Sequence, residues 1–67
     1  MTIIDARGLS CPQPVILTQK AFKEGKVPFS VKVDNEIAVE NIKRFAHSQK
    51  LTVEVATEDD DYTITLK

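Results

Sequence analysis

Hydrophobic positions recur with two different periods along this chain, and the changes of period divide it into six segments. Segments with β-branched residues or apolar residues at every second position are typical of strands, and these are residues 2–6, 29–33, 51–55 and 62–66. Segments with apolar residues three or four apart are typical of helices, and these are residues 12–23 and 36–48. The pattern predicts the order βαβαββ, with a polar hairpin connection over residues 57–61.

Each predicted helix is apolar on one side only. In the first helix that side consists of Pro14, Val15, Leu17, Ala21 and Phe22. In the second helix it consists of Ala38, Ile42, Phe45, Ala46 and Gln49. Gly25 ends the first helix, and Asp34 and Asn35 supply cap chemistry for the second.

One-sided strands and one-sided helices fit an α/β (α+β) fold, a two-layer sandwich with both helices on one face of a four-stranded sheet. The whole chain, residues 1–67, is expected to form a single domain. Right-handed crossovers make the first two strands parallel, so both end at the same edge of the sheet. The loop from Arg7 to Cys11 is then expected beside Asp34 and Asn35, at the edge where ligands gather in such sheets.

Charge and composition narrow the class of protein. With 42% hydrophobic and 28% charged residues the chain is typical of an ordinary globular protein. A net charge of −1 provides no basic footprint for nucleic acid, so none is expected as a partner. The sequence shows neither a signal peptide nor an apolar run that could span a membrane, and we expect a cytoplasmic protein with no membrane partner.

The chain has one cysteine and one histidine, which limits the chemistry open to it. A single Cys11 excludes an intrachain disulfide and a CxxC redox pair. One cysteine and His47 leave too few ligands for zinc, and the acidic run 58–61 lacks the spacing of a calcium loop. We therefore expect no metal and no cofactor.

Cys11 stands directly before a proline that can begin a helix, which predicts that it occupies the N-cap position. Since Pro12 and Pro14 lack N–H groups, the N–H of Gln13 is expected to point at the sulfur. The helix N-terminus favours the thiolate, and Arg7 adds to this effect. Three nearby carboxylates oppose it and leave the net effect open, namely Asp5, Asp34 and Glu36.

A lone thiol without a neighbouring base is not a hydrolase nucleophile, because His47 lies at the far end of the second helix. Two interpretations of Cys11 remain. It is either a carrier that accepts sulfur, selenium or a partner thiol, or a small buried hydrophobe. The residues alone do not decide between the two.

The run Asp5-x-x-Gly8-Leu9-x-Cys11-Pro12-x-Pro14 resembles the N-terminal signature of the TusA/SirA-like sulfur carriers, which have a CPxP motif at the start of the first helix. The resemblance implies a mixed sheet in the order 1-2-4-3. It also implies that Cys11 accepts a persulfide from a cysteine desulfurase-like donor and passes it to a downstream acceptor protein. The carrier is then sulfurtransferase-like, and whether it counts as an enzyme is left open.

The segment VDNEIAVENIKRFA is similar to the N-terminal domain of YedF-type proteins, which are linked with selenium metabolism and often continue into a second domain. Around Cys11 the expected supporting residues are Arg7, Gly8, Pro12, Gln13, Pro14, Asp34 and Asn35. Gly8 is expected to let its loop approach the helix closely, and Lys20, Lys23 and Lys26 to form a basic edge for an acidic partner.

A different class of function is the alternative. The same fold could serve as a regulatory or protein-interaction module without sulfur transfer. RNA binding is less favoured, because the surface lacks basic and aromatic residues together. A Cys11→Ser variant separates the two classes, since only a carrier needs the thiol.

Overall fold

The computed structural model describes residues 2–10 and 12–67 and contains six regular elements. They follow one another as β1 (Thr2–Asp5), α1 (Gln13–Lys23), β2 (Phe29–Val33), α2 (Glu36–Ser48), β3 (Val53–Glu58) and β4 (Asp61–Leu66). This order is the predicted βαβαββ.

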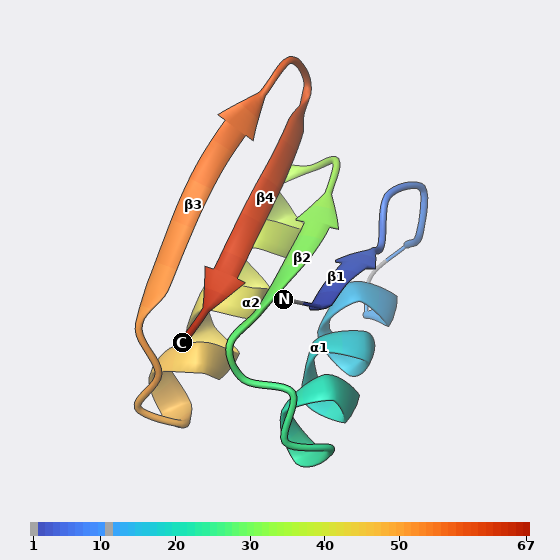
Figure 1. The fold of residues 1–67 in the computed structure, drawn as a ribbon. Helices are drawn as coiled ribbons and strands as arrows, with labels where there is room; N and C mark the ends of the chain where they lie inside the picture. The colour runs from blue at the N-terminus through green and yellow to red at the C-terminus, as the bar shows by residue number, and fades with distance from the viewer. Residues whose placement is uncertain (1, 11) are drawn as a thin grey trace.

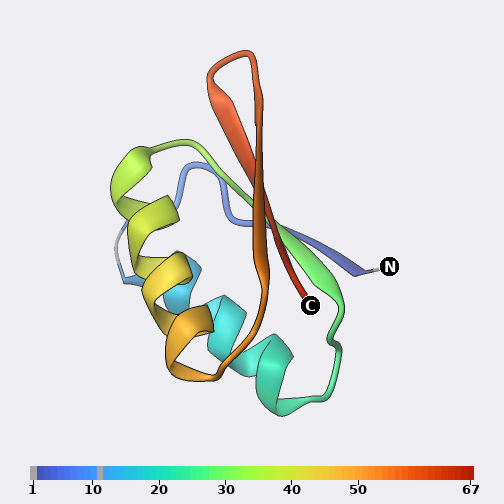
Figure 2. The same ribbon diagram turned by 90° about the vertical axis from the view of Figure 1, so that its left-hand side faces the viewer.

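The four strands form one mixed sheet in the order β1-β2-β4-β3. β1 and β2 are parallel, whereas β4 runs antiparallel to both β2 and β3. Both helices lie on the same face of this sheet, as the edge-on view shows (Figures 1 and 2). The two-layer sandwich predicted from the sequence is therefore confirmed, and so is the strand order that the family resemblance implied.

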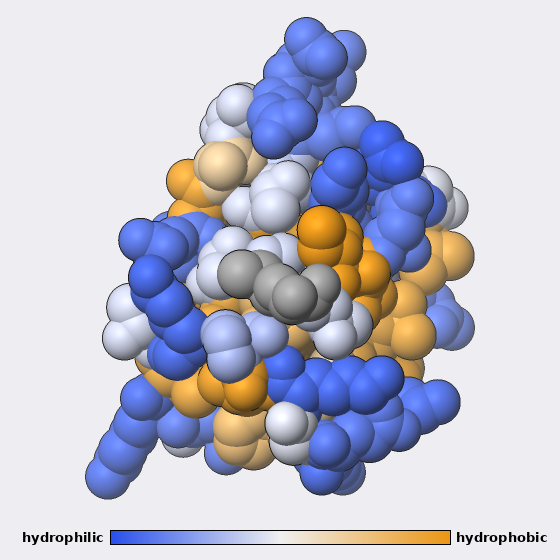
Figure 3. All heavy atoms as spheres, viewed as in Figure 1, coloured by the Kyte–Doolittle hydropathy of each residue, from blue (hydrophilic) through white to orange (hydrophobic). Residues whose placement is uncertain are grey.

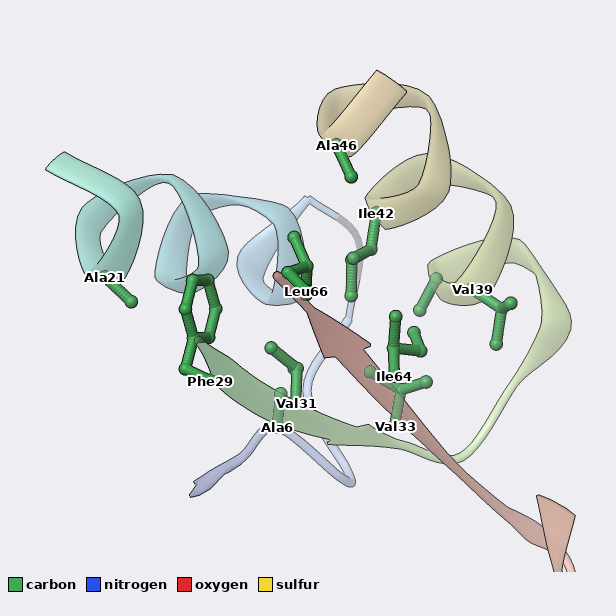
Figure 4. Packing of buried hydrophobic residues seen from close by; sticks show 11 residues of the cluster. Ala6, Ala21, Phe29, Val31, Val33, Val39, Ile42, Ala46, Ile64 and Leu66 are labelled. Atoms are coloured by element: carbon green, nitrogen blue, oxygen red, sulfur yellow. The ribbon is translucent and has the colours of Figure 1, made fainter. Parts of the chain in front are cut away.

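The core lies between the helices and the sheet, and β2 forms its centre (Figure 4). Phe29, Val31 and Val33 of β2 have no exposed surface, and they pair with Leu66, Ile64 and Tyr62 of β4. Burying a side chain of this size stabilises a fold by roughly 1.5–3 kcal/mol. From the helices, Ala21, Ala38, Val39, Ile42 and Ala46 cover these strands.

The structure corrects the predicted faces of three elements. Thr18 and Val39 are buried although the helical patterns did not include them, and Gln49 is exposed although the pattern did. Thr18 fits an apolar interior because its hydroxyl donates to the carbonyl oxygen of Pro14 at 2.8 Å. Ser30, predicted on a wet strand face, is 4% exposed and shares a hydrogen bond with the Thr65 hydroxyl.

Strand boundaries also differ from the prediction, since β1 ends at Asp5 rather than at residue 6 and β3 spans Val53–Glu58 rather than residues 51–55. The hairpin connection is a two-residue turn at Asp59 and Asp60 rather than residues 57–61, because Glu58 and Asp61 still pair across the strands. Asp59 has φ 53°, a left-handed conformation that aspartate tolerates better than most residues. In the described part of the chain, no helix is long and apolar enough to cross a membrane.

Candidate functional site

The loop after β1 is fixed by an arginine that contacts two strands. The Arg7 guanidinium donates to both carboxylate oxygens of Asp5, at 2.9 and 2.8 Å, and to Asp61 Oδ2 at 3.0 Å. Asp5 ends β1 and Asp61 begins β4, so one side chain joins the loop to two strands that are not neighbours in the sheet. The positive charge of Arg7 is thus shared between two carboxylates.

Gly8 attaches the same loop to the end of β2. Its N–H donates to Asp34 Oδ2 at 2.8 Å, and Asp34 Oδ1 accepts from the Asn35 side chain at 3.2 Å. Gly8 has φ +79°, yet a β-carbon added to it would meet none of the described residues within 4 Å. The prediction that Gly8 permits a close approach is therefore wrong, because the backbone conformation is what requires glycine here.

Helix α1 begins one residue later than predicted, at Gln13, with Pro12 at the N-cap position and no side-chain cap. The Gln13 N–H donates to the Ser10 carbonyl at 2.9 Å. The prediction that this N–H is free to point at the sulfur is therefore wrong, since the Ser10 carbonyl oxygen accepts it. Because Pro12 occupies the N-cap position, the prediction that Cys11 caps the helix is wrong, and Cys11 itself lies outside the described residues.

The prolines of the motif differ in their surroundings. Pro14 is fully buried within the first turn of α1, and its carbonyl accepts the Thr18 hydroxyl. Pro12 is exposed, and its carbonyl accepts the N–H of Ile16 at 3.1 Å. One proline thus anchors the helix start to the core, while the residue directly after Cys11 faces solvent.

The second helix begins at the same edge of the sheet, where Asn35 caps it as predicted. The Asn35 side-chain oxygen accepts the N–H of Ala38 at 2.8 Å. In the first turn, Glu36 Oε1 accepts the Tyr62 hydroxyl at 3.4 Å. We call this edge, where β1 and β2 end and α1 and α2 begin, the loop edge.

Hydrogen bonds hold the loop-edge carboxylates in their charged form. The Arg7 side chain, as hydrogen-bond donor, lowers the pKa of Asp5 well below its usual range, and Asp5 in turn raises the pKa of Arg7. The Gly8 N–H, followed by the Asn35 amide, lowers the pKa of Asp34. Desolvation, with Glu36 nearby, raises the pKa of Tyr62.

The β3–β4 turn also belongs to the loop edge, and sequence reasoning missed this. Because β4 is antiparallel to β2, the start of β4 lies beside the end of β2, and Asp61 reaches Arg7. The strand order could have predicted the position of this turn, because it places β4 next to β2. The lysines of α1, by contrast, occupy its last turn at the opposite end, so the predicted basic edge does not lie beside the Arg7–Ser10 loop.

The acidic residues do not assemble a cation site among themselves. No group of three histidine, cysteine, aspartate or glutamate residues suited to a metal ion occurs within residues 2–10 and 12–67. Of the residues predicted to support Cys11, the structure brings Arg7, Gly8, Asp34 and Asn35 together at the loop edge.

Comparison with known proteins shows which protein family this chain resembles. The family model described as sulfurtransferase TusA matches residues 2–67. The chain belongs to the TusA family. It is 42% identical over 60 residues to "Putative sulfur carrier protein MJ0990" of Methanocaldococcus jannaschii, an alignment that covers 87% of this chain and 80% of that protein.

A solved structure agrees with the family assignment. The crystal structure of a SirA-like protein from Desulfitobacterium hafniense superimposes with a TM-score of 0.90 and 31% identity, covering 98% of this chain and 95% of that one. Membership of the TusA family supports a general sulfur-carrier function, in which the chain interacts with proteins that donate and accept sulfur.

Proposed function

We propose that this TusA-family chain carries sulfane sulfur as a persulfide on Cys11 and delivers it to a second protein. The observation that carries the proposal is the placement of the sole cysteine in the CPxP motif, in the segment that joins the Arg7–Ser10 loop to α1. The family match across residues 2–67 supports this assignment. The hydrogen bonds of Arg7 and Gly8 support it further, because they fix the preceding loop to β1, to β4 and to Asp34, which follows β2.

The transfer step needs no cofactor and no outside oxidant. The Cys11 thiolate attacks the terminal sulfur of a donor persulfide, a new S–S bond forms, and the donor cysteine leaves as a thiolate. An acceptor thiolate then attacks the terminal sulfur on Cys11 and regenerates the free thiol. The chain itself is neither oxidised nor reduced over the cycle.

We expect a cysteine desulfurase-like protein as donor and a downstream sulfur-relay protein as acceptor. The similarity of the α2 segment to YedF-type proteins extends the proposal to selenium, which a thiolate can accept by the same substitution. A single domain acting in the cytoplasm fits this scheme, and the reducing compartment would keep Cys11 available.

The test is to incubate the purified chain with a cysteine desulfurase and free cysteine, then measure its intact mass under non-reducing conditions. We expect the wild type to gain one sulfur atom, to lose it on treatment with a reductant, and Cys11→Ser to gain none. Repeating the incubation with selenocysteine and a selenocysteine lyase tests for selenium, because the two elements differ in mass.

An accessibility control makes a negative result informative. If the mass stays unchanged while a small thiol reagent still labels Cys11, the thiol is reachable but does not accept sulfur from this donor. That result would contradict the proposed loading step and favour an interaction module.

A further inference from the structure

Carboxylates without an ion-pair partner gather at one end of the molecule. Of the ten acidic residues, five take part in the ion pairs of the described chain. The remaining five are Asp34, Glu36, Glu58, Asp59 and Asp60. All five belong to the loop edge or to the hairpin turn that Asp61 and Arg7 connect to it.

The cations without ion pairs are concentrated at the other end. Lys20 and Lys23 lie in the last turn of α1, Arg44 lies in the C-terminal half of α2, and Lys50 follows that helix. Lys32 on β2 is the exception within residues 2–10 and 12–67, and it lies beside Asp5 in the sheet register. A net charge of −1 therefore conceals a strong separation of charge along the molecule.

Among the described residues, three of the five large exposed apolar side chains lie at the same end as the unpaired carboxylates, while the other two, Ile3 and Val55, lie on β1 and β3. Leu9 in the loop, Ile16 in the first turn of α1 and Ile37 in the first turn of α2 are 38%, 49% and 67% exposed. Figure 3 shows hydrophilic residues gathered over the tip of the β3–β4 hairpin, beyond the body of the sheet. Apolar residues with a charged rim are the usual composition of a protein–protein interface.

We infer that the loop edge docks a partner protein whose complementary surface is apolar at its centre and basic at its rim. The inference rests on the proposed function, because it assigns the chemistry of the surface that meets Cys11. Oppositely charged surfaces accelerate association and suppress wrong partners. A basic partner would repel the opposite end of the molecule, where Lys20, Lys23, Arg44 and Lys50 lie. The charge separation would therefore orient the chain before contact.

The inference can be tested with two synthetic peptides, without identifying the natural partner. In one peptide lysine and leucine flank a central cysteine, and in the other glutamate replaces lysine. Each cysteine carries thionitrobenzoate as a mixed disulfide. The Cys11 thiolate attacks the peptide sulfur, a new disulfide forms, and the coloured thionitrobenzoate thiolate leaves, so absorbance reports the rate.

At low ionic strength we expect the lysine peptide to react about tenfold faster than the glutamate peptide, with the ratio approaching one in about 0.5 M salt. The triple variant Glu58→Gln/Asp59→Asn/Asp60→Asn should lose most of this preference. The matched control, Glu24→Gln/Glu40→Gln/Glu54→Gln, makes the same change in net charge away from the loop edge and should keep it. Ile37→Ser should slow both peptides by about threefold at any salt concentration.

Equal rates for the two peptides, a faster glutamate peptide, or an equal effect of both triple variants would overturn the inference. A failure to react with either peptide would overturn it as well. If sulfur loading fails while the lysine preference holds, the loop edge meets a basic partner that is not the sulfur donor. If loading succeeds without the preference, the proposed function stands and this inference falls.

Discussion

At the residue scale, Arg7 and Gly8 hold the loop before Cys11, and the two residues differ in what their contacts require. The contacts of Arg7 require a planar guanidinium group that donates to Asp5 and Asp61 at once, and the single ammonium group of lysine cannot reproduce this. Gly8 needs only a backbone in the left-handed region and an N–H aimed at Asp34. The sequence predicted that Arg7, Gly8 and Asp34 lie at the same edge, but it missed Asp61, and the role of Gly8 depends on a torsion angle that no residue pattern contains.

A substitution at Gly8 should therefore cost stability through the backbone alone. We expect Gly8→Ala to lower the free energy of unfolding by about 1 kcal/mol, because φ +79° is unfavourable for alanine although no described residue lies within 4 Å of the added β-carbon. Urea unfolding followed by circular dichroism measures this. Gly8→Asn is the control and should cost less, since asparagine enters this region more readily. Equal losses in both variants would point to a steric cause instead.

The Asp34 carboxylate gives the loop a defined pH dependence. Its pKa in the folded protein lies below the ordinary value of about 3.9, chiefly because Gly8 donates to it. Above that value both states are ionised and the stabilisation is complete. As the pH falls below it, the unfolded state binds a proton first and the stabilisation is lost.

We expect the unfolding midpoints of wild type and Asp34→Asn to differ most near neutral pH and to converge as the pH falls below about 3.9. Urea titrations at a series of pH values measure the difference. A constant difference across the series would show that the Gly8–Asp34 contact does not depend on the charge of Asp34.

At the scale of the element, α2 was predicted more accurately than α1, and the reason lies in their starts. Asn35 caps α2 with its own side chain, which the sequence reveals directly. At the start of α1 the Gln13 N–H donates to the Ser10 carbonyl oxygen, a backbone hydrogen bond that cannot be predicted from residue types. Local side-chain chemistry could thus be predicted, whereas the path of the loop could not.

Removing the Asn35 cap should lower the free energy of unfolding by the amount that is usual for a lost helix N-cap. We expect Asn35→Ala to cost about 1 kcal/mol, because the Ala38 N–H loses its acceptor at the start of the helix. Chemical denaturation compares it with Asn35→Asp, which retains an acceptor and should stay near the wild-type stability. If alanine and aspartate cost the same, the cap does not stabilise the helix.

Two isoleucines of α2 separate folding from recognition. Ile42 has no exposed surface and Ile37 is 67% exposed. We expect Ile42→Ala to cost about 3 kcal/mol through the cavity it leaves, and Ile37→Ala to cost less than about 0.5 kcal/mol. Thermal and urea unfolding test both variants. A large loss at Ile37 would place it in the core and remove it from the proposed docking surface.

At the scale of the whole molecule, the hydrophobic pattern predicted the layers, and the resemblance to TusA-like carriers implied the strand order. The pattern failed where neighbouring elements decide burial, as at Ser30 and Val39. The sequence analysis placed Asp5, Asp34 and Glu36 at this edge but missed the carboxylates of the hairpin turn, because that turn reaches Arg7 only once β4 is placed beside β2. Charge separation is a property of the assembled fold, since residues far apart in the sequence produce it.

The measurement that tests the central claim most directly follows one sulfur atom through the whole cycle. A cysteine desulfurase and cysteine labelled with radioactive sulfur load the chain, the donor is removed, and a protein thiol acceptor is added. We predict label on the wild type, none on Cys11→Ser, and movement of the label to the acceptor as the carrier returns to its unmodified mass. Label on Cys11→Ser equal to that on the wild type, or a wild type that is never labelled although its thiol is reactive, would contradict the account.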